Sequence, residues 1–274
     1  QLAVGTSLDG PEDINDSQRG IGYFRKTMAG IQMARSFGLE VNCICTFTSK
    51  TINHAEEIFS FFLKEGLNFS IHVELPSIKS EKYVRSAPSS EEHGKLLAKL
   101  LDLYLPQVRS IRIGTLDLMG HSVAIGRGCI CTFSDCLGSY WAVGPNGDIF
   151  PCQRFVGLSN YRLANVFDVD SISQITRSRT WQLLEERQNQ INNECKECDH
   201  ISYCRGGCPY NVLAANNESF NNNIRDPHCS AYRQTFNSIN ERALEEIFAK
   251  ENIDLVVNKV DTQKGLLRKG NILS

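Results

Sequence analysis

Nine of the eleven cysteines in this chain lie between Cys129 and Cys229, and their spacing constrains the structure more than any other feature. Thiolates two or three residues apart can converge on one metal centre, because a tight turn brings both sulfurs to the same side. Disulfide frameworks are typical of short secreted chains, whereas this chain has 274 residues and enough apolar residues for a core. The pattern therefore predicts metal binding. The spaced cysteines are Cys136, Cys152, Cys195, Cys198, Cys204, Cys208 and Cys229.

Two kinds of metal site compete for these cysteines. The four cysteines between positions 195 and 208 could by themselves form a four-thiolate structural zinc site. The pattern of all seven, with Gly147 separated from Cys152 by four residues, is more specific and favours iron–sulfur clusters. Gly147 is expected at the tip of a hairpin, where a positive φ favours glycine. Cys43 and Cys45 lie on an expected buried strand and are predicted to be small core residues.

Charge and hydropathy limit the partners. The formal net charge of −2 gives no field that would attract nucleic acid or an anionic membrane, so neither is expected as a partner. No apolar run approaches the roughly 18 residues that span a bilayer. The opening residues lack a basic leader followed by a long apolar stretch, and a cytoplasmic location is expected. The chain starts without Met in a strand-like run, which indicates that it continues upstream.

The first hundred residues alternate strand-like and helix-like segments, which predicts a parallel sheet with helices outside it. Three strands are too few for a closed barrel, and we expect the sheet to continue in residues that precede Gln1. Strands are expected over 2–8, 39–47 and 68–75, and helices over 22–37, 54–64 and 90–104.

From about Val108 the helical periodicity fades and the cysteines appear. A hairpin is expected over 140–150 around Pro145-Asn146-Gly147-Asp148, and helices over 179–190 and 227–250. The predicted division is 1–107 for the α/β part, 108–250 for the cysteine-rich part and 251–274 for a loosely held tail.

The segment from Cys136 to Cys229 resembles the SPASM domain, the twin-cluster extension of radical S-adenosylmethionine enzymes. Residues 5–11 and 15–19 are similar to the fourth-strand region of these enzymes, so the resemblance covers roughly residues 1–248. It implies an α/β fold: the carboxy-terminal part of a partial (β/α)6 TIM-type barrel, followed by a small cysteine-rich SPASM domain.

The resemblance implies two auxiliary [4Fe–4S] clusters. The fourth ligand of the first cluster would come from Cys129 or Cys131, between which the spacing does not choose; the alternative is an open coordination site for a substrate sulfur. The remaining ligands would be Cys136, Cys152 and Cys208 for the first cluster, and Cys195, Cys198, Cys204 and Cys229 for the second.

Three residues match positions that contact S-adenosylmethionine in the family. Ser7 and Arg19 would contact the cofactor, with Arg19 binding the carboxylate or the ribose of S-adenosylmethionine. Leu75 would pack on the adenine side. The structural alternative is that Ser7 and Arg19 only organise the turn after the first strand. Similarly, Asp148, Asp199 and Asp226 are expected to bond backbone groups and not to act as bases.

The chain departs from the family in one respect. The radical reaction needs a Cys-x-x-x-Cys-x-x-Cys loop for a third [4Fe–4S] cluster, and no such spacing occurs here. Either the chain lacks the first βα units, which we favour because a half-sheet would leave an unpaired edge, or it is a degenerate relative. This segment alone is therefore expected to be inactive.

The resemblance implies a maturase that abstracts hydrogen from a peptide or protein, with a flavodoxin or ferredoxin as electron donor. Sulfatase-maturing members carry an Asp base directly after the residue that matches Cys152. Here Gln153 stands at that position and cannot usefully accept a proton. The sequence thus favours a thioether or another crosslink over formylglycine formation. A non-catalytic iron–sulfur, zinc or electron-transfer protein is the remaining alternative.

Overall fold

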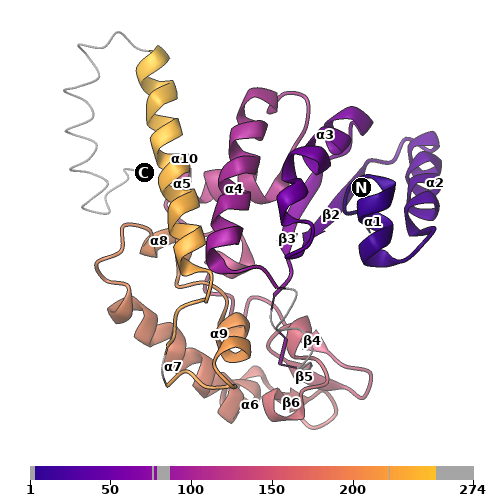
Figure 1. Cartoon of the computed structure of the whole chain (residues 1–274). Coiled ribbons are helices and arrows are strands. Elements are labelled where there is room, and N and C mark those ends of the chain that lie inside the picture. Colours follow the sequence, from indigo (N-terminus) through magenta and orange to yellow (C-terminus); the bar gives the residue numbers. More distant parts are fainter. Residues whose placement is uncertain (1–3, 76, 79–86, 222, 251–274) are drawn as a thin grey trace.

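The computed structural model describes residues 4–75, 77–78, 87–221 and 223–250. Figure 1 shows an α/β part and a cysteine-rich part, with the long helix α10 running alongside α4. The helices are α1 (Glu12–Arg19), α2 (Tyr23–Ser36), α3 (Ala55–Glu65), α4 (Ser90–Tyr104), α5 (Gly114–Ile125), α6 (Ile172–Thr176), α7 (Arg179–Glu194), α8 (Ile201–Cys204), α9 (Pro209–Ala215) and α10 (Cys229–Lys250). The strands are β1 (Val4–Ser7), β2 (Val41–Phe47), β3 (Phe69–Val73), β4 (Ala142–Val143), β5 (Asp148–Phe150) and β6 (Ala164–Asn165).

The α/β part is built on a parallel sheet in the order β1-β2-β3. A parallel bridge between Phe69 and Ile113 adds a further chain segment at the β3 edge. Side chains of β2 alternate between buried and accessible, with Cys43 and Cys45 on the buried face. This confirms the expected parallel sheet and the core role of these two cysteines, and it leaves the opposite face of the sheet open.

Local signals in the sequence explain several helix ends. Ser89 caps α4 by accepting a hydrogen bond from the backbone N–H of Glu92, whose side chain bonds back to the N–H of Ser89. Gly66 ends α3 in the left-handed conformation, with φ 60°. The expected helix over 90–104 is confirmed residue for residue, because this capping box marks its start without ambiguity.

Helical structure does not fade after Val108, contrary to expectation. Helix α5 occupies 12 residues there, and Ile111, Ile113 and Leu116 join the core of the α/β part. Apolar residues occur on every side of α5, so its sequence has no single apolar stripe from which to recognise it. Helix α1 was also missed. The expected start of the first strand at residue 2 and the tail 251–274 lie outside the described residues.

The cysteine-rich part holds one small antiparallel sheet, β4-β5-β6. Gly147 lies at the turn between β4 and β5 with φ 83°, and a Cβ there would approach Phe167 and Val166 to 2.9 Å. The predicted hairpin and its glycine are therefore confirmed. Helix α10 connects the two parts, and its Arg242 forms an ion pair with Asp102 near the C-terminal end of α4.

Candidate metal centre

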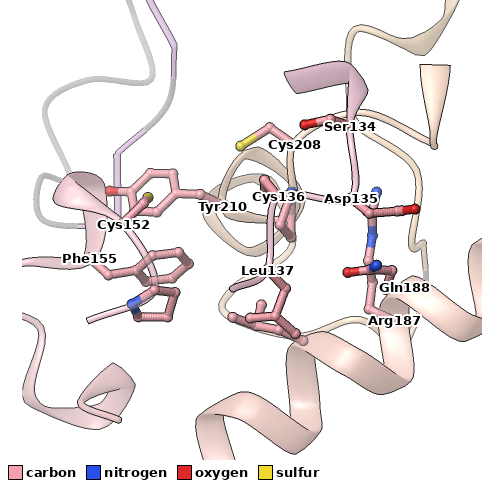
Figure 2. Close-up of a pocket in the computed structure, with 13 residues that line it drawn as sticks. Ser134, Asp135, Cys136, Leu137, Cys152, Phe155, Arg187, Gln188, Cys208 and Tyr210 are labelled. Carbon is pink, nitrogen blue, oxygen red and sulfur yellow. The ribbon is translucent and has the colours of Figure 1, made fainter. Parts of the chain in front are cut away.

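The first group of thiols lies at a small pocket in the cysteine-rich part, which is lined by Cys136, Cys152 and Cys208 (Figure 2). Cys152 follows β5, and Cys208 occupies the position before Pro209, the first residue of α9. Burial, together with the nearby thiols of Cys208, Cys131 and Cys152, raises the pKa of the Cys136 thiol to about 12. Four thiols from three separate segments thus lie close enough to interact electrostatically.

Cys131 and Cys129, between which the sequence spacing does not choose, have different surroundings in the structure. Cys131 is the first residue of a short 3-10 turn, and its thiol contributes to the raised pKa of Cys136. Cys129 instead follows α5: its backbone N–H donates to the Ser122 hydroxyl at 2.9 Å, and its Sγ lies 3.5 Å from the carbonyl of Arg127. Cys131 is therefore the better placed of the two to complete the first group.

The second group collects thiols from α7, α8, α10 and a tight turn. Cys195 ends α7, and its carbonyl accepts a 2.9 Å hydrogen bond from the N–H of Cys198. Burial raises the pKa of Cys195, and the thiols of Cys229 and Cys198 add to this effect. Burial likewise raises the pKa of Cys204 to about 12, with Cys229 and Cys198 again nearby. The two groups match the two expected ligand sets, although their roles as ligands stay predictions.

The loop between Cys204 and Cys208 joins the two groups. Arg205, Gly206 and Gly207 all have positive φ, at 54°, 73° and 75°. A Cβ on Gly206 would come within 2.2 Å of Ile191 Cγ1, and one on Gly207 within 2.2 Å of Asp226 Cβ. The two glycines are therefore needed for both conformation and space.

Asp226, almost fully buried, ties this loop to the start of α10. Its Oδ2 accepts hydrogen bonds from the Cys208 N–H at 2.9 Å and the Asn211 amide at 2.8 Å. Its Oδ1 accepts one from the N–H of His228 at 2.9 Å. Burial raises the pKa of this carboxyl, while these bonds lower it. Asp226 thus bonds the backbone, as the sequence predicted, and its side chain fixes Cys208 of the first thiol group and His228, the residue before Cys229.

Two arginines adjoin the first group. Arg154 lies over the Tyr210 ring at 3.9 Å, and its Nη1 is 3.8 Å from the Cys208 sulfur. Arg187 lines the same pocket (Figure 2) and is 4% exposed. Burial lowers the pKa of His72 on β3, and the positive charge of Arg154 lowers it further, so these two side chains lie near each other. No spacing signal in the sequence marks either arginine.

The donor set suits iron–sulfur clusters. All eleven cysteines are free thiols. Across the described part of the chain, no three cysteine, histidine or carboxylate side chains converge tightly enough for one metal ion. A four-iron cluster is held by four thiolates, so each group of four thiols offers the donor set of one such cluster.

The residues expected to contact S-adenosylmethionine lie at the carboxyl ends of the strands. Ser7 ends β1 and pairs in register with Ile44, while Leu75 follows β3 and is half-buried. Arg19 is engaged with Asp9, its Nη2 donating to Oδ1 at 2.8 Å. Arg19 thus pairs with Asp9 in the turn after β1. Contacts of Ser7, Arg19 and Leu75 with the cofactor stay predictions.

Sequence reasoning missed the buried carboxylate at the centre of this turn. Asp9 is 1% exposed and also accepts hydrogen bonds from the Gln18 amide and the Thr46 N–H, both at 2.8 Å. It thereby links β1, α1 and β2. The Asp-Gly-Pro sequence directly after the first strand is the signal that could have revealed it.

A scan against protein families matches residues 131–199 to SPASM, an iron–sulfur cluster-binding domain. None of the helices in the described residues is long and apolar enough to span a membrane.

The chain is also similar to curated proteins over much of its length. A cysteine-type anaerobic sulfatase-maturating enzyme of Clostridium perfringens strain 13 is 23% identical over 217 residues, which cover 76% of this chain and 58% of that enzyme. An uncharacterized protein of Methanothermobacter thermautotrophicus is 48% identical over 127 residues, 46% of this chain and 48% of that protein. The chain thus spans about half of the length of these relatives.

Two solved structures share the fold. Native anSMEcpe with bound AdoMet and Cp18Cys peptide has a TM-score of 0.74 at 20% identity, covering 91% of this chain and 70% of that one. Streptococcus suis SuiB bound to precursor peptide SuiA has a TM-score of 0.50 at 20% identity, covering 80% and 52%. The expected α/β fold with a carboxy-terminal SPASM domain is confirmed.

Proposed function

We propose, on the premise that this chain is a radical S-adenosylmethionine/SPASM maturase homologue, that it holds two auxiliary [4Fe–4S] clusters and serves in the modification of a peptide or protein. The observation that carries the proposal is the grouping of eight free thiols into two sets of four, joined by one loop. The first set is Cys131, Cys136, Cys152 and Cys208, and the second is Cys195, Cys198, Cys204 and Cys229.

The residues of this chain would bind and orient the two cofactors. Asp226 would fix the loop that supplies Cys208, and Arg154 would donate a hydrogen bond to the sulfur of that residue. When bound, the clusters would supply one-electron transfer near the open face of the sheet. Ser7, Arg19 and Leu75 would hold S-adenosylmethionine at the carboxyl ends of β1 and β3.

The peptide or protein substrate is proposed from the relatives. The anSMEcpe and SuiB structures each contain a peptide. In this chain's complete protein, S-adenosylmethionine would supply the 5′-deoxyadenosyl radical that takes a hydrogen atom from such a substrate and leaves as 5′-deoxyadenosine. The auxiliary clusters held by the two thiol sets would supply an acceptor for one electron. A flavodoxin or ferredoxin would supply the reducing electron for the start of the reaction.

Gln153 favours a crosslink as the product. It is an exposed amide directly after Cys152, the position at which sulfatase-maturing members carry an Asp base. An amide cannot accept a proton usefully, so a route that needs a base there is disfavoured. A thioether between a cysteine sulfur and a carbon of another residue is the product we favour.

Formylglycine formation is the second candidate, because the named relatives are sulfatase-maturating enzymes. The complete protein should be incubated anaerobically with S-adenosylmethionine and with precursor or sulfatase peptides. A thioether removes two hydrogen atoms and keeps the sulfur, whereas conversion of cysteine to formylglycine loses the sulfur. Absence of both 5′-deoxyadenosine and any mass change across these peptides would count against both candidates.

Metal analysis tests the cluster assignment first. Anaerobically reconstituted protein should contain about eight irons and eight sulfides per chain, the sum of two [4Fe–4S] clusters. The Cys131→Ala variant should lose about half of the iron, while Cys129→Ala should retain all of it. About one or two zinc ions without sulfide would instead indicate a structural thiolate domain, and the maturase proposal would fail.

A further inference from the structure

Arg187 is a cation buried inside the cysteine-rich part. It lies on α7, two turns before Cys195, with 4% of its surface exposed. Its Nε donates to the carbonyl of Ile224 at 3.0 Å and its Nη2 to the carbonyl of Gly206 at 2.7 Å. As far as the described residues show, its hydrogen bonds go to neutral carbonyls and not to a carboxylate.

Thiols of both groups lie near this guanidinium. It lines the pocket with Cys136 and Cys208 of the first group, as Figure 2 shows. Its bond to Gly206 fixes the loop that leads from Cys204 of the second group to Cys208 of the first. Its charge interacts with Cys208, Asp226, Cys136 and Cys195, in that order of strength. Arg187 therefore lies between the two groups.

A buried cation is costly unless negative charge compensates it. Burial lowers the pKa of Arg187, while Asp226 and the nearby thiols raise it. Its two hydrogen-bond acceptors are neutral carbonyls, and two thiolate-bound clusters would supply additional negative charge.

We propose that Arg187 is a positioning residue that couples the two clusters electrostatically and raises the reduction potentials of both. The inference rests on the proposed function, since it needs both clusters. Each cluster gains one electron on reduction, so its charge becomes more negative by one. A fixed cation in a low-dielectric interior stabilises that added charge, because net charge and exposure set cluster potentials.

Two other arginines near the thiols serve for comparison. Arg154 lies 3.8 Å from the Cys208 sulfur, and the charge of Arg225 acts on Cys195 and Cys229. Arg225 is also 44% exposed and pairs with Glu194 at 3.2 Å, so water and salt screen its charge. Arg225→Gln is therefore a matched control for Arg187→Gln.

The test measures iron and sulfide content and then both midpoint potentials, by redox titration followed with electron paramagnetic resonance. We expect Arg187→Gln to shift both potentials to more negative values, by an amount that hardly depends on salt. Arg187→Lys, which keeps the charge, should restore most of both potentials. Arg225→Gln should shift only the second cluster, by less, and the shift should vanish at high salt.

Several results would overturn the inference. One is an Arg187→Gln protein with full iron content and unchanged potentials, or with only one potential shifted. Another is loss of clusters in both the Gln and the Lys variants, since a cation alone would then be insufficient. A wild-type protein without iron would refute the proposed function itself, whereas these results would leave that function standing.

Discussion

At the residue scale, the positive-φ glycines of the loop between Cys204 and Cys208 lead to the sharpest prediction. Gly207→Ala places a Cβ 2.2 Å from Asp226 Cβ, at φ 75°. Gly38 has a similar φ of 71°, but a Cβ added there would meet nothing within 4 Å. Gly38→Ala should cost about 1 kcal/mol from conformation alone, and Gly207→Ala a further ~1–3 kcal/mol from overpacking.

The measurement for this pair is the urea midpoint together with iron content after reconstitution. Gly207→Ala should lose iron from both clusters, because the loop carries one thiol of each. Gly38→Ala should retain all of it. Equal effects of the two substitutions would contradict the prediction.

His93 provides a pH prediction at the same scale. Burial lowers its pKa to about 3, with His228 as a second cause, from 6.5 in an unfolded chain. The unfolded state thus binds the proton more readily, so stability should fall as the pH drops below 6.5 and continue to fall towards 3. The loss approaches about 1.4 kcal/mol per pH unit in that window. His228 and Tyr232 are the rings that face it.

Urea unfolding of wild-type and His93→Gln proteins at pH 7 and pH 4.5 measures this slope. The variant should lose less stability on acidification than the wild type. His54→Gln, which alters an exposed histidine beside Glu57, should lose as much as the wild type. A His93→Gln slope equal to that of the wild type would show that this ring does not control the acid response.

At the element scale, Asp9 joins β1, α1 and β2 through its bonds to Thr46, Gln18 and Arg19. Asp9→Asn should cost about 3 kcal/mol, because breaking a buried ion pair leaves its partner uncompensated. Glu12→Gln removes an exposed pair with Arg25 and should cost under about 1 kcal/mol. Chemical denaturation of both variants tests this difference, and equal costs would contradict it.

Sequence reasoning succeeded for elements with strong local signals and failed for those defined by packing. Helix α4 was found to the residue because Ser89 and Glu92 form its cap. Helix α5 was missed because its apolar residues are distributed over all sides of the helix and form no single stripe. The division after residue 107 stays a prediction, while Ile113 and Leu116 beyond it pack into the first core. Cys129 and Cys131 could not be told apart, since the choice depends on the turn that Cys131 opens.

At the scale of the whole molecule, the two parts differ in how their cores are built. The α/β part has one large continuous core, whereas the cysteine-rich part has three small clusters of buried apolar side chains. Small cores need additional links, and metal clusters supply them. Removal of iron with a chelator should therefore loosen residues 129–229 and leave β1, β2 and β3 intact.

Hydrogen exchange of the reconstituted and the iron-free protein measures this directly. We expect protection in α7, α8 and α9 to fall after iron removal, while that of β2 remains. Equal loss of protection in both parts would show that they unfold as one unit, and equal retention would show that the cysteine-rich part folds without metal.

The loop between Cys204 and Cys208 has an evolutionary consequence. Only three residues separate the two cysteines, yet each belongs to a different thiol group. An insertion or deletion there would displace one sulfur from both groups in a single event. Any change in the length of this loop would therefore affect both thiol groups at once.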